Sequence, residues 1–173
     1  MATKSQTVYE NPWMKVVEER VIRPDGKRGI FGVTHILPGV SILPIDDKKN
    51  VFLTKEYHYA VGRETIEAVS GAIETKEGKL EAAKRELREE TGLLAKKWIY
   101  LGRVDPLTSM VFSPAYLFLA RDLRQVKKNL EATEVIKVMK IPFKKAVSWA
   151  MNGKITHAET VVLILKVKNI LKE

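Results

Sequence analysis

The spacing of charged residues and glycines between residues 71 and 93 constrains this chain more than any other feature. A run without proline that stops at Gly92 predicts an α-helix over residues 79–91, with Gly92 in a left-handed conformation at its end. At about 100° per residue, three carboxylates share one face of that helix: Glu86, Glu89 and Glu90. Apolar residues occupy the neighbouring face: Leu80, Ala83 and Leu87. One face can therefore pack while the other collects negative charge.

Carboxylates this close together have two physical explanations. They repel each other unless cations or arginines offset their charge, and hard oxygen ligands of this kind suit Mg²⁺ or Mn²⁺. The same stretch also has the composition of an ordinary solvated helix face, on which acidic and basic residues pair four positions apart. Charge alone favours the solvated face, so the choice depends on the positions around the glutamates.

Those positions complete a longer pattern. From Gly71 to Leu93 the chain has Gly, five residues, Glu, seven residues, Arg-Glu, an aliphatic residue, any residue, Glu-Glu, any residue, Gly and an aliphatic residue. It resembles the Nudix hydrolase signature at each defining position: Gly71, Glu77, Arg85, Glu86, Leu87, Glu89, Glu90, Gly92 and Leu93. The resemblance implies the α/β class, with a Nudix-type α/β/α sandwich around a mixed sheet.

The resemblance also implies an enzyme, a pyrophosphohydrolase that cleaves a nucleoside diphosphate linked to another group. Water would attack phosphorus, with Mg²⁺ as the cofactor and Mn²⁺ as an alternative. The family pattern assigns metal ligation to Glu86 and Glu90, with Glu89 beside them, and to the backbone carbonyl of Ser70. Arg85 would orient these glutamates and balance their charge, as part of the catalytic machinery. The alternative for Arg85 is a surface ion pair.

Two further carboxylate positions follow from the family pattern. Glu77 precedes the helix and is expected to fix the loop there. A catalytic base or additional metal ligand is expected from a loop well beyond the helix, where Glu134 is the candidate and Glu131 the alternate. A mobile loop can bring a base to the attacking water. Both glutamates also fit a solvated loop.

Flanking residues narrow the resemblance to the ADP-ribose pyrophosphatase or nucleoside diphosphate sugar hydrolase branch of the family. Asn11-Pro12-Trp13 with a following hairpin resembles the N-terminal element of that branch, which commonly exchanges between subunits of a dimer. Glu67-Ala68-Val69-Ser70-Gly71 resembles its approach to the signature, and Pro106 stands near a proline that marks it. A small-molecule nucleotide substrate and a homodimer are the expected partners.

The chain also departs from that branch. Glu56-Tyr57-His58 stands where the branch usually has Gln-Tyr-Arg, so an arginine that could hold a substrate phosphate or ribose is missing. Four residues are candidates for substrate binding: Arg63, His58, Glu67 and Trp13. Arg63 would replace the missing arginine, and Trp13 would stack on a base across a dimer interface. A solvated strand position for His58 and a hairpin core position for Trp13 are the alternatives.

Residues 1–38 are expected to form an N-terminal β-hairpin element, with strands over 13–22 and 28–36 joined by a Pro24-Asp25-Gly26 turn. Two strands alone are marginal in water, so the hairpin must pack on either the main domain or a partner chain, and a dimer contact is expected. Residues 39–173 are expected to form the Nudix hydrolase domain.

Apolar patterns predict the elements of that domain. Residues 40–45 and 51–57 are expected to pair as antiparallel strands, and residues 65–70 to form one strand that leads to Gly71. Further strands are predicted over 98–104, 115–121 and 135–141, and helices over 142–152 and 157–171. The last helix is expected to place Val161, Ile164 and Leu165 on its inner side.

Composition excludes several classes of function. The 173 residues contain no cysteine, which removes thiol catalysis and thiolate metal sites and suits a reducing cytoplasm. There is no signal-peptide core and no apolar stretch of membrane-spanning length, so no membrane partner is expected. The net charge of +9 suits steering of anionic substrates. Its lysines are not interleaved with aromatics, which disfavours a nucleic-acid surface.

The leading hypothesis is Mg²⁺-dependent hydrolysis of the pyrophosphate bond of a nucleoside diphosphate sugar, ADP-ribose or similar, to a nucleoside monophosphate and a sugar phosphate. The alternative within enzymes is a nucleoside triphosphate or RNA cap pyrophosphohydrolase. A second alternative is a non-catalytic nucleotide sensor with the same fold, against which the full set of glutamates argues.

Overall fold

The computed structural model describes residues 2–126 and 136–172. Its chain divides into two units, of which the first comprises Met1–Pro38 with Asp105–Pro114 and the second Gly39–Val104 with Ala115–Glu173. The segment 105–114 therefore groups with the N-terminal residues. Among the described residues, no helix combines the length and apolar character that crossing a bilayer requires.

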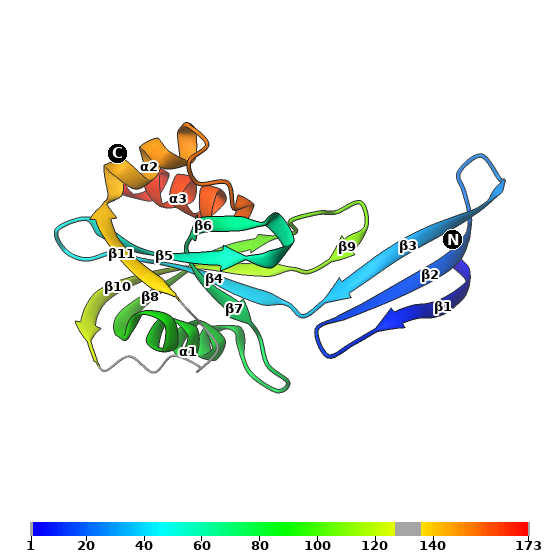
Figure 1. Ribbon diagram of the computed structural model, residues 1–173, viewed down its shortest axis with the longest axis horizontal. Coiled ribbons are helices and arrows are strands. Elements are labelled where there is room, and N and C mark those ends of the chain that lie inside the picture. The colour runs from blue at the N-terminus through cyan, green and yellow to red at the C-terminus, as the bar shows by residue number, and fades with distance from the viewer. Residues whose placement is uncertain (1, 127–135, 173) are drawn as a thin grey trace. The chain divides into compact units, whose positions relative to one another are not determined.

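The first unit is a four-stranded sheet (Figure 1) in the order β1-β2-β3-β9. Its strands are β1 (Ala2–Glu10), β2 (Met14–Ile22), β3 (Arg28–Ile36) and β9 (Val111–Phe112). The predicted hairpin is present, because β2 and β3 pair antiparallel with Met14 opposite Ile36. Gly26 closes its turn with φ 78°. Strands β1 and β9 were not predicted. They pair with the outer edges of β2 and β3, and those edges exist only once the hairpin has formed.

The second unit contains two sheets flanked by helices. One has the order β7-β4-β10-β8 and the other β11-β5-β6. The strands of the first sheet are β4 (Gly39–Pro44), β7 (Val69–Ala72), β8 (Leu93–Val104) and β10 (Ala115–Gln125). Those of the second are β5 (Asn50–His58), β6 (Arg63–Glu67) and β11 (Lys137–Pro142). A short 3-10 helix, η1 (Tyr59–Val61), joins β5 to β6.

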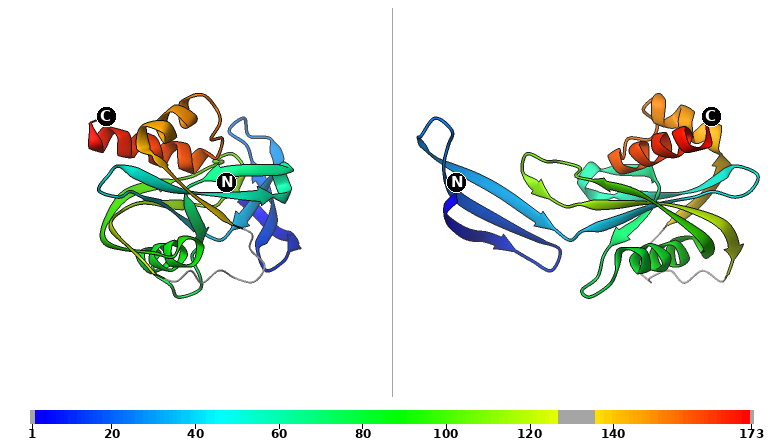
Figure 2. Two further views of the ribbon diagram at one scale, coloured as in Figure 1. Left: turned by 60° about the vertical axis from the view of Figure 1, so that its left-hand side comes forward. Right: turned by 180° about the vertical axis from the view of Figure 1, so that it is seen from behind.

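Helix α1 (Lys79–Thr91) lies on one side of the strands, and α2 (Phe143–Met151) and α3 (Ala158–Leu171) lie on the other (Figures 1 and 2). This arrangement confirms the predicted α/β class. Strand β4 contributes to both layers, because alternate residues of a strand point to opposite faces. Leu43 joins a core beneath α2 and α3, while Val40 and Ile42 join a second core beneath α1.

Helix α1 has the predicted bounds. Gly92 follows it with φ 67°, and its N–H donates to the Arg88 carbonyl at 2.9 Å. Buried Ala82, Ala83 and Leu87 hold the helix to the sheet. The local signals were sufficient here because the apolar stripe and the glycine stop act within the helix itself.

The predicted pairing of residues 40–45 with 51–57 is wrong. β4 and β5 belong to different sheets and share only an isolated bridge between Ile45 and Val51. Strand β4 pairs antiparallel with β7 on one edge and parallel with β10 on the other. Because both edges of β4 are used, no edge is left for β5, which pairs instead with β6 and β11.

The predicted single strand over residues 65–70 is two strands, which separate at Ala68 and belong to different sheets. The N–H of buried Ala68 donates to Thr160 Oγ1 at 2.8 Å, so α3 satisfies the backbone where the strand changes sheets. The predicted inner side of α3 is also partly wrong, because Leu165 is exposed whereas Thr160, Leu163, Ile164 and Val167 are buried. Apolar residues surround much of this helix, so packing rather than periodicity selects the buried face.

Replacing Thr160 with valine is expected to lower the free energy of unfolding by about 1–3 kcal/mol, because the buried N–H of Ala68 loses its acceptor. Chemical denaturation monitored by circular dichroism would measure the loss. Thr160→Ser keeps the hydroxyl and is the matched control, expected to retain most of the stability. Equal stability of Thr160→Val and wild type would contradict the assigned hydrogen bond.

Candidate active site

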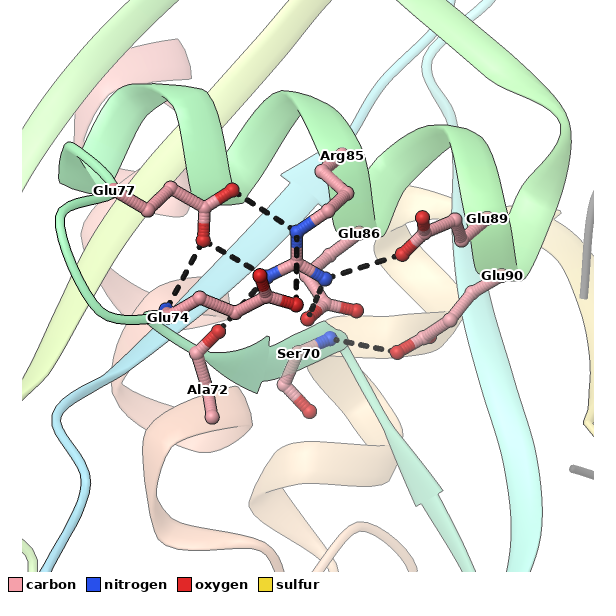
Figure 3. A network of polar contacts seen from close by, with 8 residues as sticks. All are labelled: Ser70, Ala72, Glu74, Glu77, Arg85, Glu86, Glu89 and Glu90. Carbon is pink, nitrogen blue, oxygen red and sulfur yellow. Dashed lines mark hydrogen bonds and ion pairs between the residues drawn. The ribbon is translucent and has the colours of Figure 1, made fainter. Parts of the chain in front are cut away.

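Arg85 of α1 is the centre of a network that joins the helix, the loop before it and β7 (Figure 3). Its Nε and Nη2 donate to the two carboxylate oxygens of Glu77 at 2.9 and 3.0 Å. Its Nη1 donates to Glu86 at 2.7 Å and to Glu89 at 3.1 Å, and Nη2 also donates to the Ala72 carbonyl at 2.9 Å. All five guanidinium N–H donors are therefore used.

The charges in this network stabilise one another. The hydrogen bonds that Arg85 donates to Glu77 raise the pKa of Arg85 above its usual range, against the opposing effect of burial, and Glu86 and Glu89 act in the same direction as Glu77. The hydrogen bond from Arg85 in turn lowers the pKa of Glu77 below its usual value, although partial burial opposes this. A permanent cation thus offsets carboxylates that would otherwise repel each other.

Glu77 also organises the loop between β7 and α1. Its Oε2 accepts the N–H of Glu74 at 3.1 Å, and its own N–H donates to the Glu74 carbonyl at 3.0 Å. With both oxygens bound to Arg85 as well, Glu77 links the loop to the helix. Its carboxylate therefore holds other groups in place and points to Arg85.

Glu86 and Glu90 lie against the backbone of β7. A Cβ added at Gly71 would overlap the Glu86 carboxylate, so only glycine lets this side chain approach the strand. Ser70 donates its N–H to Glu90 Oε1 at 3.4 Å, and Glu90 is only 6% exposed. Two carboxylates, one helical turn apart, are thereby placed beside the Ser70–Gly71 backbone (Figure 3).

These residues fit a hard divalent cation by the chemistry of their donors, since carboxylate and carbonyl oxygens are what Mg²⁺ and Mn²⁺ prefer. Within residues 2–126 and 136–172, however, no three His, Asp or Glu side chains converge on one point at metal-binding distance. Glu86 and Glu89 turn an oxygen toward Arg85 instead. Cation binding would therefore require small rotations of these side chains. The other expected carboxylates, Glu131 and Glu134, lie outside the described residues.

The expected substrate residues form a second polar group, on β5 and β6. His58 Nε2 lies 3.2 Å from Glu67 Oε1, and Thr65 Oγ1 donates to the same oxygen at 2.5 Å. Arg63 Nη2 donates to Thr156 Oγ1 at 2.8 Å. A cavity of about 400 Å³ lies between these side chains and the start of α3. His58, Arg63 and Glu67 are therefore brought together, as one substrate subsite would require.

Sequence reasoning missed His157, which lies 3.3 Å from the other oxygen of Glu67. It follows Glu67 by 90 positions, and no spacing rule connects the two. The available signal was chemical, because the chain has only three histidines and this one is the first residue of a predicted helix. Trp13 belongs to the first unit and is 74% exposed. The alternative that Trp13 occupies a core position of the hairpin is therefore wrong.

Comparisons with known proteins agree with these features. Residues 2–34 match the family model of the nucleoside diphosphate sugar hydrolase N-terminal domain, and residues 35–161 match that of the NUDIX domain. The chain is 25% identical over 167 residues to an ADP-ribose pyrophosphatase of Bacillus subtilis, a match that covers 92% of this chain and 87% of that protein. It is 28% identical over 123 residues to an ADP-ribose pyrophosphatase of Mycobacterium tuberculosis, covering 70% and 59% respectively.

A solved structure agrees with the architecture. The crystal structure of an ADP compounds hydrolase superposes with a TM-score of 0.88 at 23% sequence identity, covering 99% of this chain and 94% of the other. At this identity the likeness establishes the fold. The mixed sheets and flanking helices are thus those of known structures.

Replacing Arg85 with glutamine is expected to destabilise the metal-free protein at pH 7, because Glu77, Glu86 and Glu89 lose their shared cation. The pKa of Glu77 is lowered in the folded state, below its ordinary value of 4.5. Its ion pair therefore stabilises the fold fully when the pH is above 4.5, and this stabilisation is lost as the pH falls below that value. The difference from wild type should therefore shrink in acid. Urea denaturation in EDTA at several pH values would measure it.

Arg88→Gln, on the exposed side of the same helix, is the matched control. It removes one positive charge without touching the network and should show no such dependence on pH. A stability difference for Arg85→Gln that stays constant from neutral pH to below 4.5 would contradict the assigned role of Glu77.

Proposed function

The chain belongs to the NUDIX domain family, and on that premise we propose that it hydrolyses the pyrophosphate bond of a nucleoside diphosphate sugar such as ADP-ribose. The products would be a nucleoside monophosphate and a sugar phosphate. The proposed reaction rests on the network in which Arg85 binds Glu77, Glu86 and Glu89. In the same network, Glu86 and Glu90 lie against β7. The nucleoside diphosphate sugar hydrolase match at residues 2–34 supports the substrate class.

Each part of the network has a proposed role. Glu86, Glu90, Glu89 and the Ser70 carbonyl would hold Mg²⁺ or Mn²⁺. When bound, such a cation neutralises non-bridging phosphate oxygens and lowers the cost of attack by water. Arg85 would keep the glutamates oriented and limit their mutual repulsion before the cation binds. Glu134, with Glu131 as the alternate, is the proposed catalytic base.

Substrate binding is proposed for the second polar group and for the N-terminal unit. His58, Arg63 and Glu67 share one cavity in the catalytic unit, which residues 39–173 would form. Trp13 presents an exposed aromatic face on which a nucleobase can stack. ADP-ribose pyrophosphatases among the relatives support an adenine nucleotide as the first substrate to examine.

A panel of ADP-ribose, ADP-glucose, GDP-mannose, diadenosine polyphosphates and 8-oxo-dGTP with Mg²⁺ would test the substrate class. Release of nucleoside monophosphate and sugar phosphate from a sugar nucleotide is the expected result. Preference for a triphosphate over every sugar nucleotide would overturn the proposed substrate. Binding of ADP-ribose without turnover by the metal-loaded protein would instead identify a nucleotide sensor.

Glu90→Gln is expected to lower kcat by about a hundredfold or more, because a metal ion supplies several kcal/mol of transition-state stabilisation. Glu81→Gln makes the same chemical change on the exposed side of α1 and should leave kcat near the wild-type value. Thermal unfolding would show that both variants are folded. Near-normal turnover of folded Glu90→Gln would refute the proposed metal site.

A homodimer formed through the first unit is also proposed. Its sheet exposes several large apolar side chains: Tyr9, Trp13, Ile30, Phe31 and Phe112. Large apolar side chains that a small sheet leaves exposed are candidates for burial in a contact between subunits. Residues 1–38, with Phe112 of the adjoining strand β9, would thus supply the contact while the second unit supplies the catalytic residues.

Ile30→Glu is expected to shift the protein from dimer to monomer, because Ile30 is 68% exposed and a buried carboxylate there would be unpaired. Light scattering would report a wild-type mass of twice 19.6 kDa. Lys27→Glu, in the exposed turn of the same hairpin, is the control and should remain dimeric. A strictly monomeric wild type would rule out the proposed contact.

A further inference from the structure

The cavity between β6 and the start of α3, proposed above for substrate binding, contains two histidines whose contacts the proposed hydrolysis leaves unexplained. It measures about 400 Å³, and its polar lining comes from β5, β6 and the loop that precedes α3: His58, Arg63, Thr65, Glu67, Thr156 and His157. Five of these residues can donate hydrogen bonds to an anion, through a hydroxyl, a guanidinium or a ring N–H, whereas Glu67 is the carboxylate at their centre. Their contacts indicate how the cavity changes with protonation.

Glu67 holds both histidines by one ring nitrogen each. Its Oε1 lies 3.2 Å from His58 Nε2, and its Oε2 lies 3.3 Å from His157 Nδ1. His157 Nδ1 is also 2.9 Å from Thr160 Oγ1, which ties the ring to α3. A histidine that donates one ring N–H to a carboxylate can donate its second N–H to a ligand only as an imidazolium. Anion binding by these rings therefore requires that they take up protons.

Other groups of the cavity favour an anion without titrating near neutral pH. Arg63 carries a permanent positive charge and is oriented by its hydrogen bond to Thr156 at 2.8 Å. Helix α3 has 14 residues, and no side chain caps its N-terminus. Its first residue, Ala158, lines the cavity, so the positive end of the helix dipole lies beside this space.

The balance of charge depends on the two histidines. Glu67 and Glu159 supply the negative charge around them, and Arg63 supplies the positive charge. With both histidines neutral, two carboxylates outweigh one guanidinium. With both protonated, three cations outweigh two carboxylates. Burial raises the pKa of Glu159, and the nearby Glu67 adds to this rise while His157 opposes it, so the negative charge also declines in acid.

We propose that this cavity is a proton-linked binding site for a dianionic phosphate group, in which His58 and His157 become protonated as the anion binds. Arg63 and the start of α3 supply the charge that is independent of pH. This inference deepens the proposed substrate binding and rests on the proposed function for a substrate phosphate, but anion binding itself requires neither the glutamates of α1 nor a metal ion.

Two sources of such a group are compatible with this position. Glu67 and Ser70 are three residues apart, so extended chain separates them by about 11 Å at most. A phosphate of the substrate or of its sugar phosphate product is therefore within reach of the α1 network. Free inorganic phosphate is the other source.

Sulfate is the suitable probe because it stays dianionic across the titration range of histidine. NMR spectra of the three histidines, assigned with His→Gln variants, would be recorded from pH 5 to 9 with and without sulfate. Sulfate should raise the titration midpoints of His58 and His157 and tighten its own binding by about tenfold or more from pH 8 to pH 6. His35, which packs 5.7 Å from Phe112 in the other unit, should not shift and is the internal control.

Variants that remove one positive charge distinguish binding of sulfate at this site from its non-specific attraction to a basic protein. Arg63→Gln should weaken sulfate binding at least about tenfold, because it removes a hydrogen-bonded cation. Arg23→Gln removes an equally exposed charge from a turn of the first unit and should have no effect. Equal weakening by both variants, or sulfate shifts that include His35, would assign the binding to an adventitious ion only and overturn the proposal.

Competition with sulfate distinguishes the two sources. Ribose 5-phosphate that displaces sulfate at a lower concentration than inorganic phosphate would assign the site to the substrate or product. Equal displacement would assign it to free phosphate. Failure of both to displace sulfate would contradict a phosphate site. These outcomes do not depend on turnover, so an inactive but sulfate-binding protein would refute only the proposed hydrolysis.

Discussion

The guanidinium of Arg85 is the interaction on which the rest of the α1 site depends. It gives all five N–H groups to acceptors on the helix, the preceding loop and β7. Without this cation, Glu77, Glu86 and Glu89 would stand close together in a partly buried space and would lose the positive charge that offsets their repulsion. The same contacts explain two residues of the motif that precede the helix. Glu77 ties the loop to Arg85, and Gly71 leaves the room that Glu86 occupies.

A second constraint comes from β4, which uses both of its edges and both of its faces. It pairs with β7 and β10 and contributes to the cores beneath α1 and beneath α2 and α3. The chain from β6 must therefore change sheets at Ala68 to reach β7, and Thr160 satisfies the backbone there. The histidine cavity lies at the β6 end of this connection, and the α1 network lies at its β7 end. Their proximity is a result of the sheet topology.

Membership of the NUDIX family explains the α1 site but not the cavity. The family motif contains each residue of the Arg85 network, whereas His58 and His157 stand outside it. His58 occupies the position where the sequence lacks the expected arginine, and its partner Glu67 is shared with His157, from the loop before α3. A side chain that is always charged is thus replaced by one whose charge depends on protonation. The cavity is accordingly the part of the molecule in which this chain differs from the pattern it otherwise follows.

The sequence by itself determined helix α1, its stop at Gly92 and the clustering of its glutamates, because these depend on periodicity and on backbone freedom within one segment. It also predicted the β2–β3 hairpin from its turn. Only the tertiary structure decided that β5 pairs away from β4, that residues 65–70 divide at Ala68, and that Leu165 faces solvent. It alone brought His157 to Glu67. These features depend on contacts between residues far apart in the sequence, such as the 90 positions between Glu67 and His157. Packing of the whole chain, rather than any local pattern, decides which strand edges pair and which helix face is buried.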